Sequence, residues 1–459
     1  MPVHAIRTGP SRAAGGRSPM SFHDHDGSHY LNYPGVEHLS GDVTADAFAQ
    51  ALASHSPDEA LALHVRLPGC LRECHIRDTR QAPSRGSHKA APYLRRLDRE
   101  MELIGHLLNR PPPVQRLHWG GGAAACLSLD QLSDLFDRLD ARFGLSGARD
   151  RDFSIEIDPR EADVFTLRHL QALGFNRLSL GVMELDLRVQ KSIGRVQPRV
   201  LTESLVDEAE RLGFRSLNLD LVVGLPRQTP ASFAETLDQV VAMAPARITL
   251  RCHAQLPQGD RLQHEIRAED RSDDATRQAL LDAARKRLGE AGYVAIGLGH
   301  FARPDDSLAL ALGEGRLARD LQGYTPYPPG DQVGLGVAAI SRVGDTCVRN
   351  AESLAAYQAA LDSGRLALAG GVRLGAAGRL RRDAIETLAC RRELDLTALS
   401  RDHGLNATRT LADALARLDP LCQAGLLERH GERLRVTPGG VQDLSHLLAA
   451  LTPEAAAMS

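Results

Sequence analysis

Hydrophobic and polar positions repeat in one pattern from residue 61 to residue 299. Short apolar runs of strand length alternate with longer stretches in which apolar residues recur every three or four positions, the spacing typical of an amphipathic helix. Strands that alternate with helices at this interval predict a parallel sheet built from βαβ units, and about six such units predict a barrel or partial barrel. The predicted strands are residues 61–67, 114–122, 153–159, 176–182, 216–226, 246–254 and 293–299, and the predicted helices are residues 92–108, 127–144, 162–174, 201–213, 230–244 and 273–292.

The alternation ends near residue 300, and the chain divides there. We expect residues 1–50 to form a partly disordered N-terminal arm, residues 51–300 the barrel, and residues 301–372 an extension of the barrel and a connector. In residues 373–459, predicted helices precede a short hairpin, which predicts a mainly helical, winged-helix-like domain. Because the charge of this domain is mixed, we expect it to pack against the barrel or cover a substrate rather than bind DNA.

Composition narrows the class of partner. The 459 residues carry a formal net charge of -3, which gives no general attraction to nucleic acid or to anionic membranes. There is no run of about 18 apolar residues, so no membrane-spanning helix is expected. The seven cysteines are odd in number and scattered, unlike a secreted disulfide framework, and favour a reducing cytoplasm. We expect a cytoplasmic monomer that acts on a small molecule.

Two cysteines point to metal chemistry. Cys70 and Cys74 match the first two positions of a C-x3-C-x2-C iron–sulfur motif, but Arg77 stands at the third. A guanidinium has no lone pair to offer iron, so Arg77 cannot replace the missing thiolate. A tetrahedral zinc site made by the two cysteines with His64 and His75 is an alternative, although this spacing is not a usual zinc signature.

A run of glycines follows the second predicted strand. Three consecutive glycines, Gly120, Gly121 and Gly122, come directly after Trp119. Glycines let the backbone approach a ligand closely and offer N–H groups to it, whereas a tight turn between strand and helix explains the same run without any ligand. Their place at the carboxyl end of a strand favours the ligand.

Carboxylates also lie near strand ends. Glu156 and Asp158 alternate with Ser154 and are expected to share a face, where a carboxylate can hold an amine or a ribose hydroxyl. Asp220 interrupts an otherwise apolar strand, and a buried carboxylate is costly unless it is paired. Arg195 is a candidate partner for Asp220. The alternative for each carboxylate is an ordinary ion pair.

Taken together, these residues resemble the oxygen-independent coproporphyrinogen III oxidases of the radical SAM superfamily. The similarity runs nearly end to end, in ordered blocks, and no single block would suffice. The blocks are HKAAPYL (88–94), LHWGGG (117–122), SIEIDPRE (154–161), GFNRLSLGV (174–182), NLDLVVGLPRQTPASF (218–233), GHFARPDDSLA (299–309), QGYT (322–325) and GLGVAAIS (334–341).

The resemblance implies a partial (β/α) barrel of the radical SAM type with the C-terminal domain over the substrate. It implies a [4Fe-4S] cluster that reductively cleaves S-adenosylmethionine, a second bound S-adenosylmethionine, and oxidative decarboxylation of coproporphyrinogen III to protoporphyrinogen IX in haem synthesis. By the matching motifs, Cys70 and Cys74 would ligate iron. The implied cofactor contacts are Gly120, Gly121, Gly122, Glu156, Arg195, Asp220, Ala254 and Ile340.

The chain departs from the family pattern around the cluster loop. Besides Arg77 at the third cysteine position, these departures are His64 for a tyrosine, Ile76 for an aromatic residue, Thr79 for a fourth cysteine, Ala123 and Ala124 for Thr-Pro, Met183 for a glutamine, and Gly299 for an aspartate. They leave three interpretations open. The chain is an oxidase of this family, a non-catalytic haem- or porphyrin-binding protein on the same scaffold, or a zinc-stabilised structural paralogue.

Overall fold

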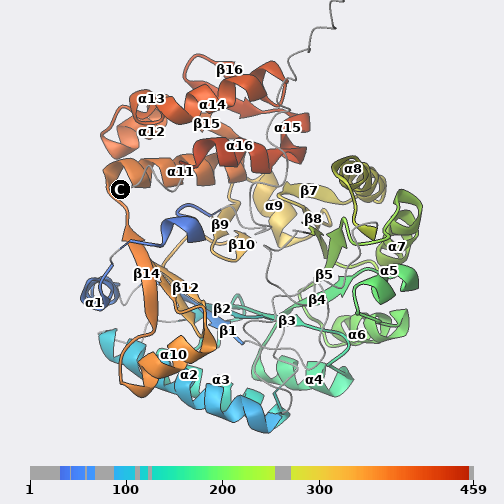
Figure 1. The fold of residues 1–459 in the computed structure, drawn as a ribbon, viewed down its shortest axis with the longest axis vertical. Helices are drawn as coiled ribbons and strands as arrows, with labels where there is room; N and C mark the ends of the chain where they lie inside the picture. Colours follow the sequence, from blue (N-terminus) through green and yellow to red (C-terminus); the bar gives the residue numbers. More distant parts are fainter. Residues whose placement is uncertain are drawn as a thin grey trace, which may run out of the picture.

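The protein was analysed as a computed structural model (Figure 1), which describes residues 32–41, 43–56, 59–67, 87–108, 114–121, 127–253 and 270–453, with the backbone alone for residues 87–89. Most of the predicted N-terminal arm therefore lies outside the described residues. The same holds for Cys70, Cys74, Arg77, Gly122 and Ala254.

One twelve-stranded sheet forms the body of the molecule, in the order β14-β13-β12-β11-β1-β2-β3-β4-β5-β6-β8-β7. Strands β1 to β6 are mutually parallel, as the alternating pattern predicts. Beyond β6 the sheet continues with antiparallel strands, and beyond β1 it continues with the parallel strand β11 and then with antiparallel strands. The parallel strands are β1 (Leu61–Arg66), β2 (Val114–Gly120), β3 (Asp152–Ile157), β4 (Arg177–Met183), β5 (Ser216–Val223) and β6 (Arg247–Cys252). The flanking strands are β7 (Val294–Gly297), β8 (His300–Ala302), β11 (Gln332–Leu335), β12 (Ile340–Val343), β13 (Thr346–Asn350) and β14 (Leu368–Arg373).

Helices cover the outer face of this curved sheet (Figure 1). Local signals set their ends: Ser128 caps α3 by accepting a hydrogen bond from Gln131 N, and Gly144 and Gly174 end α3 and α4 in the left-handed conformation. The helices that follow the strands are α2 (Ser87–Leu107), α3 (Leu129–Phe143), α4 (Val164–Leu173), α6 (Arg199–Arg211), α7 (Pro230–Ala242) and α8 (Asp274–Glu290). Shorter ones are η1 (Val36–His38), α1 (Ala45–Ala53), α5 (Leu187–Ser192) and α10 (Leu354–Asp362). The predicted partial barrel is confirmed.

The C-terminal domain packs against the edge strand β7 and against Leu374, just after the opposite edge strand β14, at the top of the view in Figure 1. It is mainly helical with a three-stranded wing, so the winged-helix-like prediction is confirmed, although sequence reasoning missed the three-residue strand β15. A connecting segment contains α9 (Ser307–Gly313), β9 (Ala318–Asp320) and β10 (Gly323–Thr325). The domain contains α11 (Ala376–Arg391), β15 (Glu393–Asp395), α12 (Leu396–His403), α13 (Ala407–Thr410), α14 (Ala412–Gln423), β16 (Leu427–His430), β17 (Arg433–Val436), α15 (Pro438–Gln442) and α16 (Leu444–Leu451). In the described part of the chain, every helix is too short or too polar to cross a bilayer.

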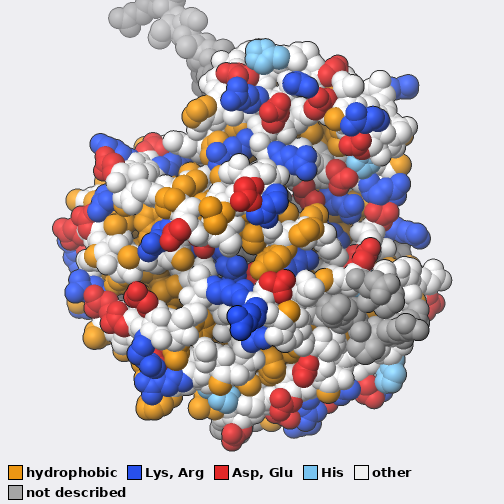
Figure 2. Space-filling model, turned by 180° about the vertical axis from the view of Figure 1, so that it is seen from behind, with side chains coloured by type: hydrophobic (Ala, Val, Ile, Leu, Met, Phe, Trp, Pro, Cys, Tyr) orange, Lys and Arg blue, Asp and Glu red, His pale blue; other side chains and the backbone are white. Residues whose placement is uncertain are grey.

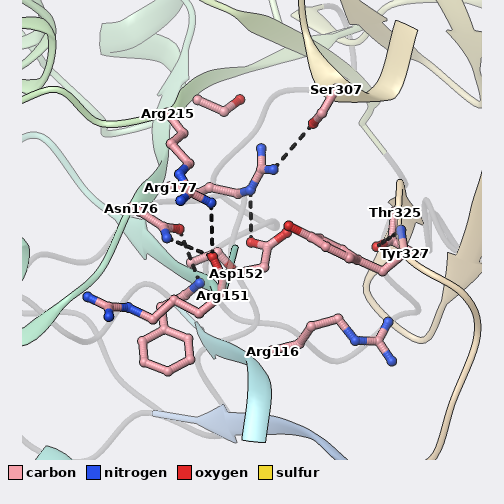
Figure 3. Close-up of polar contacts among 12 residues, drawn as sticks. Arg116, Arg151, Asp152, Asn176, Arg177, Arg215, Ser307, Thr325 and Tyr327 are labelled. Carbon is pink, nitrogen blue, oxygen red and sulfur yellow. Dashed lines mark hydrogen bonds and ion pairs between the residues drawn. The ribbon is translucent and has the colours of Figure 1, made fainter. Parts of the chain in front are cut away.

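Polar contacts close the amino-terminal end of the strands (Figure 3). Arg177, at the start of β4, pairs with Asp152 at the start of β3 over 2.8 Å and donates to Ser307 of α9 over 3.2 Å. Tyr327, just after β10, donates its hydroxyl to the Asp150 carbonyl over 3.0 Å. The connecting segment is thus fixed to the floor of the barrel, at the end opposite the predicted site.

On the face shown in Figure 2, acidic and basic side chains are interspersed.

A buried carboxyl group joins α2 to the sheet. Glu100 is 2 % exposed and accepts hydrogen bonds from Gly336 N at 2.7 Å, Tyr357 Oη at 2.6 Å and Asn350 Nδ2 at 2.5 Å. Burial raises the pKa of Glu100 to about 7, against the opposing effect of these three donors. The folded protein therefore binds the proton of Glu100 more tightly than the unfolded chain does.

Glu100 predicts a specific pH dependence of stability. Because its pKa rises from 4.5 to about 7 on folding, its contribution to stability is full below pH 4.5 and is lost as pH rises toward 7. Relative to wild type, Glu100→Gln should gain on the order of 2–3 kcal/mol between pH 5 and pH 8. Urea unfolding at several pH values, read by the fluorescence of the single tryptophan, measures this difference. Parallel stability curves for the two proteins would contradict the assignment, and Glu102→Gln on the same helix serves as the control.

Candidate active site

Polar side chains line the inner face of the parallel strands, from the middle of the strands toward their carboxyl ends. Alternate residues of a strand share one side of the sheet, and strands paired in register bring these residues side by side. Hydrogen bonds and ion pairs join them across neighbouring strands. They are His64 on β1, His118 on β2, Ser154 and Glu156 on β3, Ser179 on β4, Asn218 and Asp220 on β5, and Thr249 and Arg251 on β6.

Glu156 places a negative charge at the carboxyl end of β3. Its Oε2 accepts a hydrogen bond from Gly121 N at 3.0 Å, and its Oε1 lies 3.6 Å from His118 Nε2. Burial raises the pKa of Glu156, but His118, Arg251 and the Gly121 N–H outweigh burial and hold the pKa below its ordinary value. The side chain keeps 29 % of its surface exposed. Glu156 is thus an ionised carboxylate that a ligand can reach.

Close packing requires glycine at positions 120 and 121. Gly121 has φ 97°, and a Cβ there would lie 2.4 Å from the Leu67 carbonyl oxygen. A Cβ on Gly120 would lie 2.9 Å from His64 Nε2 and 3.0 Å from His118 Nε2. Close packing therefore accounts for Gly120 and Gly121 without a ligand, and the Gly121 N–H is already bound to Glu156.

Asp220 is held by three donors. It is 5 % exposed, and it accepts hydrogen bonds from Ser179 Oγ at 2.9 Å and Asn218 Nδ2 at 3.1 Å. Arg251 Nη2, from the neighbouring strand β6, lies 3.3 Å from Asp220 Oδ1. The prediction that Arg195 pairs with Asp220 is wrong, because the register of β5 and β6 gives this carboxylate a different arginine.

Arg195 instead serves Asp158. Its two terminal nitrogens contact the Asp158 carboxylate at 2.6 and 3.0 Å, and Arg160 contacts the same carboxylate at 2.7 Å. All three side chains are at least nine-tenths buried. Burial raises the pKa of Asp158, but the two guanidiniums outweigh burial and hold the pKa below its ordinary value. Strand β3 ends at the residue before Asp158, so Asp158 lies just outside the row of inner-face residues. Its carboxylate is the shared partner of two buried arginines.

The connecting segment also reaches the site. Gln322, between β9 and β10, places its side-chain amide 2.8 Å from His64 Nδ1, and the rings of His64 and His118 lie 5.2 Å apart. Burial, together with His118 and Arg66, holds the pKa of His64 well below its ordinary value, so this imidazole is neutral at physiological pH. Ile340 begins β12, on the other side of β1 from β2.

Several residues of this face were not among the site residues predicted from the sequence. Their signal was polar residues at alternating positions in apolar strands, as in Ser-x-Glu, Asn-x-Asp and Thr-x-Arg. The missed residues are His118, Ser179, Asn218, Thr249, Arg251 and Gln322. Within the described ranges, no three His, Cys, Asp or Glu side chains are arranged to hold a metal ion. The predicted residues Cys70, Cys74, Gly122 and Ala254 lie outside those ranges.

Comparisons with known proteins agree with this architecture. The radical SAM superfamily matches residues 67–240, and the HemN C-terminal domain matches residues 354–442. The oxygen-independent coproporphyrinogen III oxidase of Pseudomonas aeruginosa is 37 % identical over 91 % of each chain. The enzyme of the same name from Escherichia coli K12 is 36 % identical over 91 % of each chain.

A solved structure extends the comparison to three dimensions. Coproporphyrinogen III oxidase (HemN) from Escherichia coli, described as a radical SAM enzyme, superposes with a TM-score of 0.87 at 36 % identity, covering 92 % of this chain and 96 % of that one. Family, fold and C-terminal domain therefore match over almost the whole length. The chain belongs to the oxygen-independent coproporphyrinogen III oxidase family of the radical SAM superfamily.

Proposed function

We propose that this chain is an oxygen-independent coproporphyrinogen III oxidase that converts coproporphyrinogen III to protoporphyrinogen IX, using S-adenosylmethionine bound at the carboxyl ends of β3 to β6. The observation that carries the proposal is the pair of inward-facing carboxylates, Glu156 and Asp220, in a chain whose relatives of that name match it nearly end to end. We further propose that it acts as a cytoplasmic monomer.

The described side chains fit S-adenosylmethionine by their chemistry. Glu156 is ionised and reachable, so it can accept hydrogen bonds from the ligand's ammonium group. Asp220 presents a carboxylate already fixed by Ser179 and Asn218, which suits it to accept from ribose hydroxyls. In this assignment Arg195 acts through Asp158, since its terminal nitrogens bind that carboxylate and the Gly181 carbonyl.

The iron–sulfur motif supplies two of its three cysteine ligands. In this family a bound [4Fe-4S] cluster supplies the electron that cleaves S-adenosylmethionine. Cys70 and Cys74 provide two thiolates, whereas Arg77 has no lone pair with which to bind iron. A third ligand must come from another residue of the chain. Arg77 therefore favours a second candidate, a protein that binds porphyrin or haem on this scaffold without radical chemistry.

Anaerobic reconstitution with iron and sulfide separates the two candidates. The oxidase assignment predicts about four irons per chain, an EPR signal after reduction, and cleavage of S-adenosylmethionine to 5′-deoxyadenosine. Arg77→Cys should retain the cluster and slow its loss of iron to a chelator, because a third thiolate is then available. Cys74→Ala is the control and should abolish iron binding.

The remaining outcomes are equally informative. A cluster in Arg77→Cys but not in wild type would mean that the wild-type chain has lost radical chemistry, and a shift of the Soret band on adding haemin would then support the binding protein. One zinc per chain and no iron would overturn both candidates in favour of a structural metal site.

A further inference from the structure

We propose that Asn218 is a positioning residue: it fixes the Asp220 carboxylate in the orientation that receives S-adenosylmethionine. The proposal rests on the proposed function, because it takes Asp220 to be a contact for that ligand. Asn218 itself touches no cofactor in this account and acts through Asp220.

The pairing of strands brings the participating side chains together. Asn218 and Asp220 lie two residues apart on β5 and so share its inner side. On β4, Ser179 pairs with Asn218, and on β6, Thr249 pairs with Asp220. His300 of β8 pairs in turn with Thr249. The chain of contacts therefore follows from the register of four adjacent strands.

Both polar atoms of the Asn218 amide are engaged in hydrogen bonds with neighbouring side chains. Its Nδ2 donates to Asp220 Oδ1 at 3.1 Å and to Ser179 Oγ at 2.8 Å, and Ser179 donates its own proton to Asp220 Oδ2 at 2.9 Å. The Oδ1 of Asn218 accepts a hydrogen bond from Thr249 Oγ1 at 2.9 Å. Both oxygens of Asp220 thus receive donors that Asn218 supplies or orients. Only a primary amide at this position can donate twice and accept from Thr249.

The chain continues to the C-terminal domain. His300 Nδ1 lies 3.3 Å from Thr249 Oγ1, and the ring of His300 meets Tyr324 edge-on at 5.6 Å between centroids. Tyr324 donates its hydroxyl to the Ala389 carbonyl of α11. Burial, with Arg251, Arg319 and Arg247, lowers the pKa of His300 to about 3, so this imidazole is neutral. Because the Thr249 hydroxyl already donates to Asn218, its oxygen accepts the hydrogen bond from His300 Nδ1–H.

Asn218→Asp tests the positioning role by a pH signature. The variant is nearly isosteric but replaces two donors with a carboxylate beside Asp220. Two adjacent carboxylates share one proton, and the protonated form of the pair restores a donor to Asp220. The other groups facing the pair are Arg251 and Arg247 on β6, neutral His300 on β8 and uncharged Ser179 on β4.

Binding of S-adenosylhomocysteine to the reconstituted, oxidised protein is measured by isothermal titration calorimetry from pH 6 to pH 8.5. At pH 8.5 the affinity of Asn218→Asp should be roughly 10- to 100-fold weaker than that of wild type, and it should recover as pH falls. Wild type should show no such recovery. The matched control is Asn176→Asp, which alters the same residue type at the floor of the barrel (Figure 3) and should bind as wild type does at every pH.

Thr249→Val provides a second test that adds no charge. It removes the hydroxyl that orients the Asn218 amide and should weaken binding by roughly 2- to 10-fold, without a pH signature. If Asn218→Asp fails to fold, as judged by tryptophan fluorescence, wild-type affinity in Thr249→Val overturns the proposal.

The outcomes separate this proposal from the proposed function. Wild type that binds no S-adenosylhomocysteine refutes the proposed function, and with it the role of Asn218. Wild type that binds, with Asn218→Asp equal to it at every pH, refutes only the positioning role. A variant weakened equally at every pH also refutes the positioning role, because a general structural lesion would produce that result.

Discussion

Glu156→Gln is expected to weaken the binding of S-adenosylmethionine by roughly 30-fold, because the variant loses one charge-assisted hydrogen bond of about 2 kcal/mol. The substitution preserves the shape of the site. A glutamine oxygen can still accept from Gly121 N, which now lies 3.0 Å from the carboxylate. The expected loss is therefore in ligand binding, with little change in folding. Isothermal titration calorimetry on the reconstituted protein measures it.

The control for this variant is Glu203→Gln, a partly exposed position on the outer helix α6. It removes the same charge at a distance from the strand ends and should leave the affinity unchanged. An affinity of Glu156→Gln equal to that of wild type would show that the ligand's ammonium group is bound elsewhere.

Asp158→Ala is expected to lower the free energy of unfolding by about 3–5 kcal/mol, because it leaves the guanidiniums of Arg160 and Arg195 buried without their shared carboxylate. Urea unfolding measures the loss. Trp119, the single tryptophan, reports on the barrel because it is 1 % exposed and packs against Phe175 at 4.9 Å between ring centroids.

The loss in Asp158→Ala should depend on pH with a definite sign. Because folding lowers the pKa of Asp158 below its ordinary 3.8, the stabilisation is present above that value and disappears as pH falls through the folded value. Asp305→Ala, which breaks an exposed ion pair with Arg303, is the control and should cost less than about 1 kcal/mol. Equal losses in the two variants would refute a structural role for the buried ion pairs.

The sequence predicted the architecture well because its signals are local. Alternating apolar runs located the parallel strands, and helical spacing located the helices, whose ends are set by local capping residues such as Ser128 and Gly174. Predictions failed where the answer depended on distant segments. The predicted strand 293–299 forms as β7, but β7 pairs antiparallel with β8 instead of joining the parallel strands. Strand β15 is short enough to need its partner β17 to form.

The candidate site also contains residues that the sequence could predict and residues that it could not. Glu156 and Asp220 stood out because acids are unusual in apolar strands, and the structure places both on the inner face. The partners of these acids could not be predicted, since they depend on strand register: Arg251 lies beside Asp220, while Arg195 pairs with Asp158 across the loop after α5. Asn218 and Thr249 gave only weak signals, because single neutral polar residues in strands have many structural roles.

The cluster loop shows what spacing alone can establish. Cys70 and Cys74 indicated metal chemistry of several kinds, including a zinc site, and the ordered blocks along the chain were needed to identify the family. Once the family was identified, Arg77 became informative, because it stands where the family's cluster motif has its third cysteine. A local motif was interpretable only through matches spread over the whole chain.

Conversion of coproporphyrinogen III is the most direct test of the account. The reconstituted protein is incubated anaerobically with coproporphyrinogen III, S-adenosylmethionine and a reductant, and the porphyrins are separated by liquid chromatography after oxidation. The account predicts protoporphyrin in amounts that depend on S-adenosylmethionine and fall sharply in Glu156→Gln. Unchanged coproporphyrin from a protein that has assembled its cluster and bound S-adenosylmethionine would contradict it.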